Sequence, residues 1–281
     1  MRGLASAFSA GAAFAKGGEA GMRTLYDAIV GHIVSSGRRI RGMSGTIQDI
    51  GITKAYLTEE DVRIERELKQ LVHQSHPRHE FYAEEENDQA HDAEDVWVVD
   101  PISGTRLFVA GLPHSAIVAA HVHKKEVQFG AVYDPSMDTL YTAYKNEGAF
   151  LNGQRISISN RGAESPKVIF NLALDWKDDA IAREVSRRLE GFELYRLLGS
   201  HAVNDCLVAS GKCDGVVCLA KDSFPYFASS LIIKEAGGVF TNLAGDENIV
   251  STDRVFVGGD KQTYQTLKRI VDELFKERPA G

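Results

Sequence analysis

The sequence predicts a mixed α/β fold in which helices and sheets stack in layers. Two amphipathic helical segments open the chain after about residue 22, and short β-rich runs without helical period follow between residues 96 and 144. From residue 167 to residue 275, strand-like and helix-like segments alternate. An antiparallel meander next to an alternating α/β region implies a layered sandwich.

The two opening helices are defined by apolar residues at helical spacing. The first is predicted from Met22 to a basic end at residues 38–41, and the second from Thr58 to His73, where Thr58 can cap the start. The apolar positions of both are Leu25, Ile29, Ile33 and Val34, then Val62, Ile64, Leu68, Leu71 and Val72. Each helix should therefore present one apolar face.

After the second helix, the apolar residues no longer follow a helical period. Residues 96–100 form a short apolar run that ends in a carboxylate, which is typical of a buried strand. Three β-rich runs separated by turn residues follow at 117–123, 127–133 and 139–144, the spacing of an antiparallel meander. In the second half, strands are predicted at 167–172, near Tyr195, at 215–218, 239–241 and 255–258, and helices at 178–189, 202–210, 227–236 and 261–275.

Composition limits the classes of function. The 281 residues are 43% hydrophobic and 25% charged, with a net charge of -7 that gives no reason to expect a nucleic-acid partner. No apolar run could span a membrane. The three cysteines have neither disulfide-scaffold nor zinc-site spacing and favour a cytoplasmic protein. Residues 1–20 lack the apolar centre of a signal peptide and are predicted to be a flexible extension.

We expect residues 21–281 to form one domain, with a metal-site half at 21–160 and a C-terminal α/β half at 161–281. Three acidic clusters fall in the first half: Asp61 with Glu65, residues 84–86, and Asp100. The first two patterns are common on solvated helices and loops. At Asp100, a buried strand ends in Asp-Pro and then Gly-Thr, which puts a carboxylate, a carbonyl and a hydroxyl on one turn. Magnesium takes such hard oxygen ligands.

The segment Trp97-Val98-Val99-Asp100-Pro101-Ile102-Ser103-Gly104-Thr105 resembles the signature of the inositol monophosphatase family. Other motifs of that family follow in order over residues 22–275, among them Gly148-Ala149-Phe150-Leu151-Asn152-Gly153 and Glu235-Ala236-Gly237-Gly238. The resemblance implies a five-layer αβαβα sandwich of the inositol monophosphatase and fructose bisphosphatase type. It further implies a magnesium-dependent phosphomonoesterase acting on a small phosphorylated metabolite, and a homodimer.

Transferred to this chain, the resemblance places the first magnesium on Glu84, Asp100, the Ile102 carbonyl and Thr105. Asp61 and Thr105 would activate the attacking water. The substrate phosphate would lie near Gly104, Thr105, Arg106 and Ser200. All of these residues are present.

The second magnesium site of the family is incomplete here. One of its aspartates is replaced by Ser103, and an ungapped count back from Glu235 places Pro225 at the other. Proline has no side-chain oxygen. Asp222, three residues earlier, is a candidate substitute ligand. The acidic residue that binds the sugar in inositol-specific members falls on Cys218, which argues against inositol phosphate itself as the preferred substrate.

Three hypotheses follow. The first is a weak metal-dependent phosphomonoesterase with one complete metal site, and the second is a catalytically inactive pseudoenzyme that binds a ligand or partner. The third, an unrelated fold, requires the motifs to be coincidental. We interpret Trp97 as core, His201 as a loop residue, and His114, His121 and His123 as strand residues rather than ligands.

Overall fold

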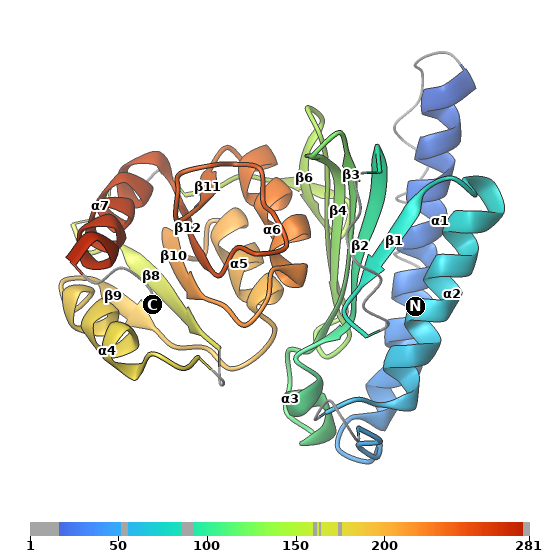
Figure 1. Ribbon diagram of the computed structural model, residues 1–281, viewed down its shortest axis with the longest axis horizontal. Coiled ribbons are helices and arrows are strands. Elements are labelled where there is room, and N and C mark those ends of the chain that lie inside the picture. Colours follow the sequence, from blue (N-terminus) through green and yellow to red (C-terminus); the bar gives the residue numbers. More distant parts are fainter. Residues whose placement is uncertain are drawn as a thin grey trace.

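The computed structural model describes residues 17–51, 56–85, 93–159, 162, 164–173 and 176–277. Within these ranges the chain forms two β-sheets separated and flanked by helices, in the layer order helix, sheet, helix, sheet, helix (Figure 1). This is the predicted five-layer αβαβα sandwich. The predicted extension 1–20 lies mostly outside the described residues, and its last four residues belong to the first helix.

The first sheet has the strand order β1-β2-β3-β4-β5-β6-β7, and only β1 and β2 run parallel. Its strands are β1 (Glu80–Ala83), β2 (Asp95–Ser103), β3 (Ala116–His123), β4 (Glu126–Asp134), β5 (Thr139–Tyr144), β6 (Gly148–Leu151) and β7 (Gln154–Ile156). The meander through β3, β4 and β5 was predicted within one residue at each end. Three short strands, β1, β6 and β7, were missed.

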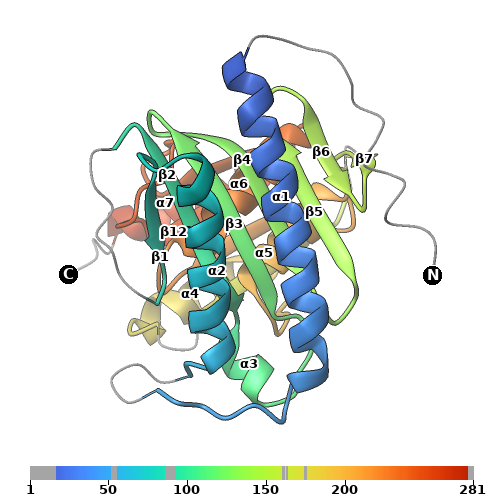
Figure 2. The ribbon, with the colours of Figure 1, turned by 90° about the vertical axis from the view of Figure 1, so that its right-hand side faces the viewer.

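Helices α1 (Gly17–Ile40) and α2 (Glu59–Ser75) cover the outer face of this sheet (Figure 2). Leu25, Ile29, Ile33, Ile64 and Leu68 are all at most 4% exposed and pack on the sheet. The helical spacing in the sequence therefore identified the correct buried faces. A short 3-10 turn, Arg41–Met43, ends the first helix.

The second sheet has the order β11-β12-β10-β8-β9. Its strands are β8 (Lys167–Leu172), β9 (Glu193–Tyr195), β10 (Gly215–Leu219), β11 (Val239–Asn242) and β12 (Val255–Gly259). Helices α4 (Asp179–Arg188) and α7 (Lys261–Glu277) cover its outer face, while α5 (His201–Ala209) and α6 (Phe224–Glu235) lie between the two sheets (Figure 1).

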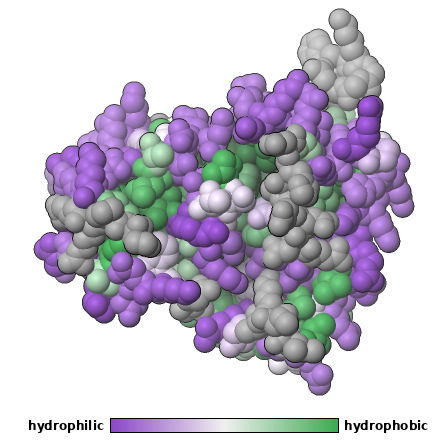
Figure 3. All heavy atoms as spheres, viewed as in Figure 1, coloured by the Kyte–Doolittle hydropathy of each residue, from purple (hydrophilic) through white to green (hydrophobic). Residues whose placement is uncertain are grey.

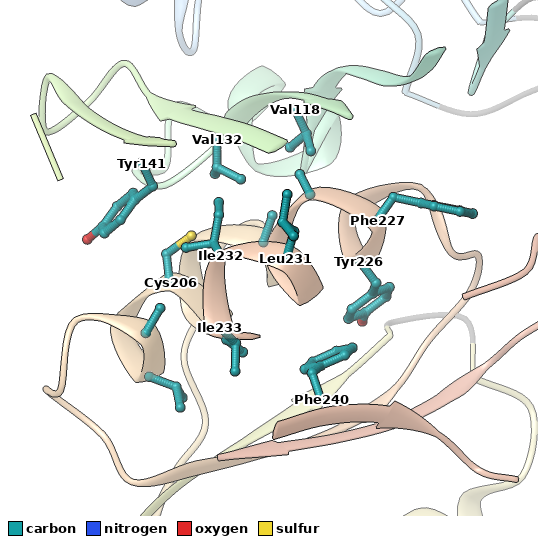
Figure 4. Close-up of a cluster of buried hydrophobic side chains, with 14 of the residues drawn as sticks. Val118, Val132, Tyr141, Cys206, Tyr226, Phe227, Leu231, Ile232, Ile233 and Phe240 are labelled. Carbon is teal, nitrogen blue, oxygen red and sulfur yellow. The ribbon is translucent and has the colours of Figure 1, made fainter. Parts of the chain in front are cut away.

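The middle layer is almost wholly buried because both of its faces meet a sheet. Figure 4 shows Leu231 and Ile232 of α6 directed at Val118 and Val132 of the first sheet, with Phe240 of the second sheet on the other side. The helix approaches closely at Gly130, where a side chain would meet the Ala228 carbonyl at 2.8 Å. No described helix has the length and apolar character that crossing a membrane requires. On the face drawn in Figure 3, hydrophilic residues predominate and hydrophobic ones form separate patches.

Candidate active site

A cavity of about 620 Å³ lies where strands and helices from both halves of the chain end. Six residues predicted to bind metal or phosphate line this cavity: Glu84, Asp100, Gly104, Thr105, Arg106 and Ser200. Ser103, Asp222 and Pro225, from the predicted second metal site, line it as well. The structure thus brings together side chains that are up to 141 positions apart in the sequence, from Glu84 to Pro225.

The wall around Asp100 is shaped by a bulge at the end of β2. Asp100 pairs with Val118 and Ser103 pairs with Ala116, so the β2 side has one residue more than the β3 side. Pro101 has no N–H to donate, and a bulge re-aims the backbone next to it. The freed Ile102 carbonyl accepts a hydrogen bond from the Thr105 hydroxyl at 2.7 Å.

Gly104 sits between these two groups with φ of +84°, a conformation that side chains disfavour. It also passes close to the backbone of Ser200, 3.5 Å from where a Cβ would lie. Gly104 caps a short helix, α3 (Thr105–Val109), which the sequence did not reveal. The turn therefore needs glycine for its conformation, and a Cβ there would be in ordinary van der Waals contact with the other half of the chain.

Asp61 is held at the start of α2 by a capping box with Thr58. Its Oδ2 accepts from the Thr58 backbone at 2.8 Å, and its Oδ1 faces the Thr105 hydroxyl at 3.3 Å. Burial raises the pKa of Asp61 to about 7, against the hydrogen bonds from Thr58 and with the help of the neighbouring Glu85 and Glu84 charges. A carboxylate that titrates near neutrality is suited to take and return a proton.

Glu84 follows the last residue of β1, and its backbone N–H donates to the Val99 carbonyl of β2 at 3.2 Å. The next residue, Glu85, is held by α2, because its backbone N–H donates a hydrogen bond to the Glu65 carboxylate at 3.2 Å. Glu65 is 1% exposed, so the acidic pair on α2 faces the site rather than solvent. Glu86 lies outside the described residues.

Ser103 and Pro225, which the sequence analysis predicts to replace two metal ligands, make other contacts here. Ser103 accepts a hydrogen bond from the Ser200 hydroxyl at 2.8 Å, which links the two halves of the chain. Pro225 occupies the first turn of α6, where its fixed φ and missing N–H are tolerated. The helix begins at Phe224, three residues earlier than predicted, and the Phe224 N–H donates to the Asp222 carboxylate at 3.2 Å.

Several lining residues were not singled out from the sequence. Lys221 places its Nζ 4.0 Å from Glu84, and Tyr56 presents its ring to the Arg106 guanidinium at 5.2 Å. Leu172, Leu197 and Leu198 give the cavity an apolar side. No motif marks these positions, because they come from separate loops and strand ends. Cys218 is fully buried behind the cavity against Asp205, so it offers nothing to a sugar hydroxyl.

Two interpretations of histidines are corrected. His201 is the first residue of α5 rather than a loop residue; it lines the cavity and contacts the Tyr226 hydroxyl at 2.5 Å. His114 lies in a turn with φ of 68°, not in a strand, and bonds to Asp134 at 2.8 Å. His121 and His123 do lie on β3, as predicted.

Comparison with known proteins decides what this arrangement belongs to. The sequence profile of the inositol monophosphatase family matches residues 26–275. The chain belongs to the inositol monophosphatase family. A "fructose-1,6-bisphosphatase/inositol-1-monophosphatase" of Thermotoga maritima is 31% identical over 80% of this chain and 85% of its own length. The "Nus factor SuhB" of Escherichia coli is 29% identical over 78% of this chain and 84% of its own.

Solved structures give the same result. An inositol monophosphatase of Thermotoga maritima superimposes with a TM-score of 0.77 at 26% identity, covering 89% of this chain and 98% of that one. The family is one of magnesium-dependent phosphatases. The Asp100 carboxylate, a carbonyl and a hydroxyl at one turn, together with the Glu84 carboxylate at the end of the neighbouring strand, form a set of hard oxygen donors that fits magnesium.

Proposed function

We propose that this member of the inositol monophosphatase family is a weak magnesium-dependent phosphomonoesterase acting on a small phosphorylated sugar, polyol or nucleotide. The hydrogen bond from the Thr105 hydroxyl to Asp61, beside a cavity lined by Glu84 and Asp100, carries the proposal of hydrolysis. The Ser103–Ser200 hydroxyl pair is the reason to expect weak activity, because the resemblance places a second metal ligand at Ser103. Glu84, Asp100, the Ile102 carbonyl and Thr105 would hold one ion. When bound, that magnesium would polarise the phosphoryl group and lower the pKa of water.

The chain's own groups would move the proton. The Thr105 hydroxyl lies between the Ile102 carbonyl and Asp61, at 2.7 and 3.3 Å. A water in the cavity can donate to the Thr105 oxygen while the Thr105 hydroxyl donates to Asp61. These two hydrogen bonds would orient the attacking water, and Asp61 would receive its proton through Thr105. Gly104, Thr105, Arg106 and Ser200 would contact the phosphate, with Arg106 supplying a positive charge.

Loss of the second metal would slow the departure of the leaving group. Two metals clamp both the attacking and the leaving oxygen, and removing one is expected to cost several kcal/mol, about a thousandfold in rate. Lys221 and Asp222 are the charged groups on the leaving-group side of the cavity. Lys221 would offset part of the lost charge, and Asp222 is the candidate substitute ligand.

The substrate is proposed to be less polar around its leaving group than inositol. Cys218 is buried where inositol-specific members place an acid, and three leucines line the cavity. A hydroxyl-rich ring would leave its donors unpaired against such a wall. Nucleotides, whose bases present apolar faces, fit this surface better than a hydroxyl-rich polyol phosphate.

A catalytically inactive binding protein is the alternative. Two observations favour it: both second-metal positions are replaced, and some relatives carry the name Nus factor rather than an enzyme name. In this case the cavity would bind a phosphorylated ligand without turning it over, and the surface would serve a partner.

A magnesium titration on a panel of sugar, polyol and nucleotide phosphates separates the two functions. The phosphatase hypothesis expects slow turnover that needs magnesium and is lost in Glu84→Gln. The Glu59→Gln variant, on the exposed start of α2, controls for a change in charge. Phosphate-ester binding without turnover would instead support the binding protein.

We also propose that the protein is a cytoplasmic homodimer. The dimer rests on the family resemblance, and the cytoplasm is supported by three free cysteines, all buried. Light scattering should give twice the mass of one 30.8 kDa chain. The mass of a single chain over a wide concentration range would contradict the dimer.

A further inference from the structure

A second cluster of potential ligands lies at the opposite end of β2 from the cavity. Within the described part of the chain, His79, Asp95 and His121 place one nitrogen or carboxylate oxygen each within 4.8 Å of one another. Asp95 is the first residue of β2 and Asp100 the sixth, so the cluster is about 16 Å along the strand from the active-site carboxylate. None of its residues lines the cavity.

We propose that His79, Asp95 and His121 form a structural binding site for a zinc-class divalent transition metal. The ion would be held by Nε2 of both histidines and by the Asp95 carboxylate. Imidazole nitrogen favours such ions over magnesium, which prefers oxygen ligands.

The geometry converges on Asp95. His121 Nε2 lies 3.0 Å from Asp95 Oδ1, and His79 Nε2 lies 3.8 Å from Asp95 Oδ2. The two imidazole rings are parallel, with an interplanar angle of 5° and centroids 5.4 Å apart. Ligand atoms of a tetrahedral zinc site are about 3.4 Å apart, given bonds of about 2.0 to 2.1 Å. Small side-chain rotations would therefore close the site.

A fourth ligand is available at the rim. His123 lies two residues after His121 on the same face of β3 and directly opposite Asp95. Its Nδ1 is 2.7 Å from Asp95 Oδ1. Its side chain is 38% exposed, against 4% for His121. Four protein ligands would give a closed site, which is the pattern of structural rather than catalytic zinc.

The cluster combines one carboxylate with imidazoles that lie largely out of water. The side chains of His121 and His79 are 4% and 11% exposed, and that of Asp95 is 24% exposed. Two imidazoles and a carboxylate together form a donor set suited to a transition-metal cation.

The hydrogen bonds at Nδ1 of the two imidazoles predict a spectroscopic signal of metal binding. The Tyr26 hydroxyl lies 2.7 Å from Nδ1 of His121 and can accept a hydrogen bond from its N–H. The Trp97 indole N–H donates to Nδ1 of His79 at 3.3 Å and cannot accept. A metal on Nε2 of His79 moves that ring's proton to Nδ1, without net proton release, and breaks the indole bond. Trp97, which also stacks on His121 at 5.1 Å, should therefore report binding.

Bound metal would join the short strand β1 to the sheet. His79 immediately precedes β1, which has four residues and pairs only with β2. Glu84 follows the other end of β1. An ion bridging His79 to Asp95 on β2 and His121 on β3 would fix one end of β1 and so stabilise the strand that carries Glu84 to the cavity.

The test is a zinc titration of the untagged full chain in saturating magnesium, in a Glu84→Gln background that excludes the active site. A Trp176→Phe change leaves Trp97 as the fluorescent reporter, because the chain has two tryptophans. Calorimetry should find one zinc per chain, with a matching change in Trp97 fluorescence. Co²⁺ should bind with the visible absorption of a four- or five-coordinate site.

His79→Gln and Asp95→Asn should each weaken zinc binding at least about a hundredfold. His123→Gln, a rim change that keeps the buried part of the cluster, should weaken it about tenfold. The matched control is His32→Gln, which removes a half-buried histidine 3.2 Å from Glu67 on another surface and should bind zinc like the parent. Three results would overturn the proposal: no zinc binding at about 100 μM, unchanged zinc affinity in the His79 and Asp95 variants, or no change in Trp97 fluorescence on zinc binding.

Discussion

The two ends of β2 carry similar carboxylates in opposite chemical settings. At the C-terminal end, Asp100 is 3% exposed beside Glu84, a backbone carbonyl and the Thr105 hydroxyl, all oxygen donors. At the N-terminal end, Asp95 meets the imidazoles of His121 and His123 at 3.0 and 2.7 Å. The donor set, rather than the carboxylate, distinguishes the two ends: one fits magnesium and the other fits a zinc-class metal.

The same comparison applies across the cavity. The first half of the chain lines the cavity with Glu84, Asp100 and Thr105, whereas the second half contributes Pro225 and Ser200, whose hydroxyl donates to Ser103. The first half thus offers oxygen donors that fit a cation, while the second half offers a proline and a hydroxyl that is already hydrogen-bonded. Three experiments test these differences.

Restoring both missing carboxylates should have the largest effect. Ser103→Asp with Pro225→Asp should raise magnesium-dependent hydrolysis by up to about a thousandfold, far more than either change alone, because half a site does not hold the ion. Turnover and calorimetric magnesium stoichiometry should be measured together. A second magnesium bound without any gain in turnover would refute the claim that these two positions limit the activity. The Ser200→Ala variant controls for loss of the hydroxyl pair.

A change at Asp100 should show that the two proposed metal sites, one at each end of β2, act independently. Asp100→Asn should lower magnesium-dependent hydrolysis at least about a hundredfold, because a neutral amide replaces a charged metal ligand. Zinc binding, read from Trp97, should remain. His32→Gln should retain both properties. Simultaneous loss of zinc binding and hydrolysis in Asp100→Asn would mean that the two ends are not independent.

A third buried carboxylate, Asp205, has no proposed metal and gives, for comparison with the two carboxylates of β2, the effect of burial alone. It is fully buried, and burial raises its pKa to about 7 despite hydrogen bonds from Ser229 and others. Because its pKa is higher in the folded than in the unfolded chain, its stabilising contribution is complete below about pH 4 and is lost as the pH rises through 7. About two pH units of this loss fall between pH 5 and pH 8, or roughly 3 kcal/mol at about 1.4 kcal/mol per unit.

Asp205→Asn, which resembles the protonated acid, should remove this pH dependence. Urea unfolding at pH 5 and pH 8 measures the difference. Equal pH dependence in the parent and the variant would contradict a raised pKa, and would show that burial alone does not keep such a carboxylate protonated in this layer.

The sequence determined much of the fold because its signals are local. Helical spacing identified the buried faces of α1 and α2, and the meander runs had turn residues between them. The elements that it missed, such as β1 and α3, span four and five residues. Elements of that length contain too few positions to show a period, and only their neighbours hold them in place.

The sequence alone also identified the family, because the family's motifs follow one another in order along the chain, and it predicts the residues of a first metal site. Only the tertiary structure decided what surrounds them. Lys221 reaches Glu84, and Ser200 reaches Ser103, across gaps of 137 and 97 positions. His79, Asp95 and His121 looked unrelated until β-sheet register placed them together. Contacts between distant segments depend on how layers pack, and no local pattern records that packing.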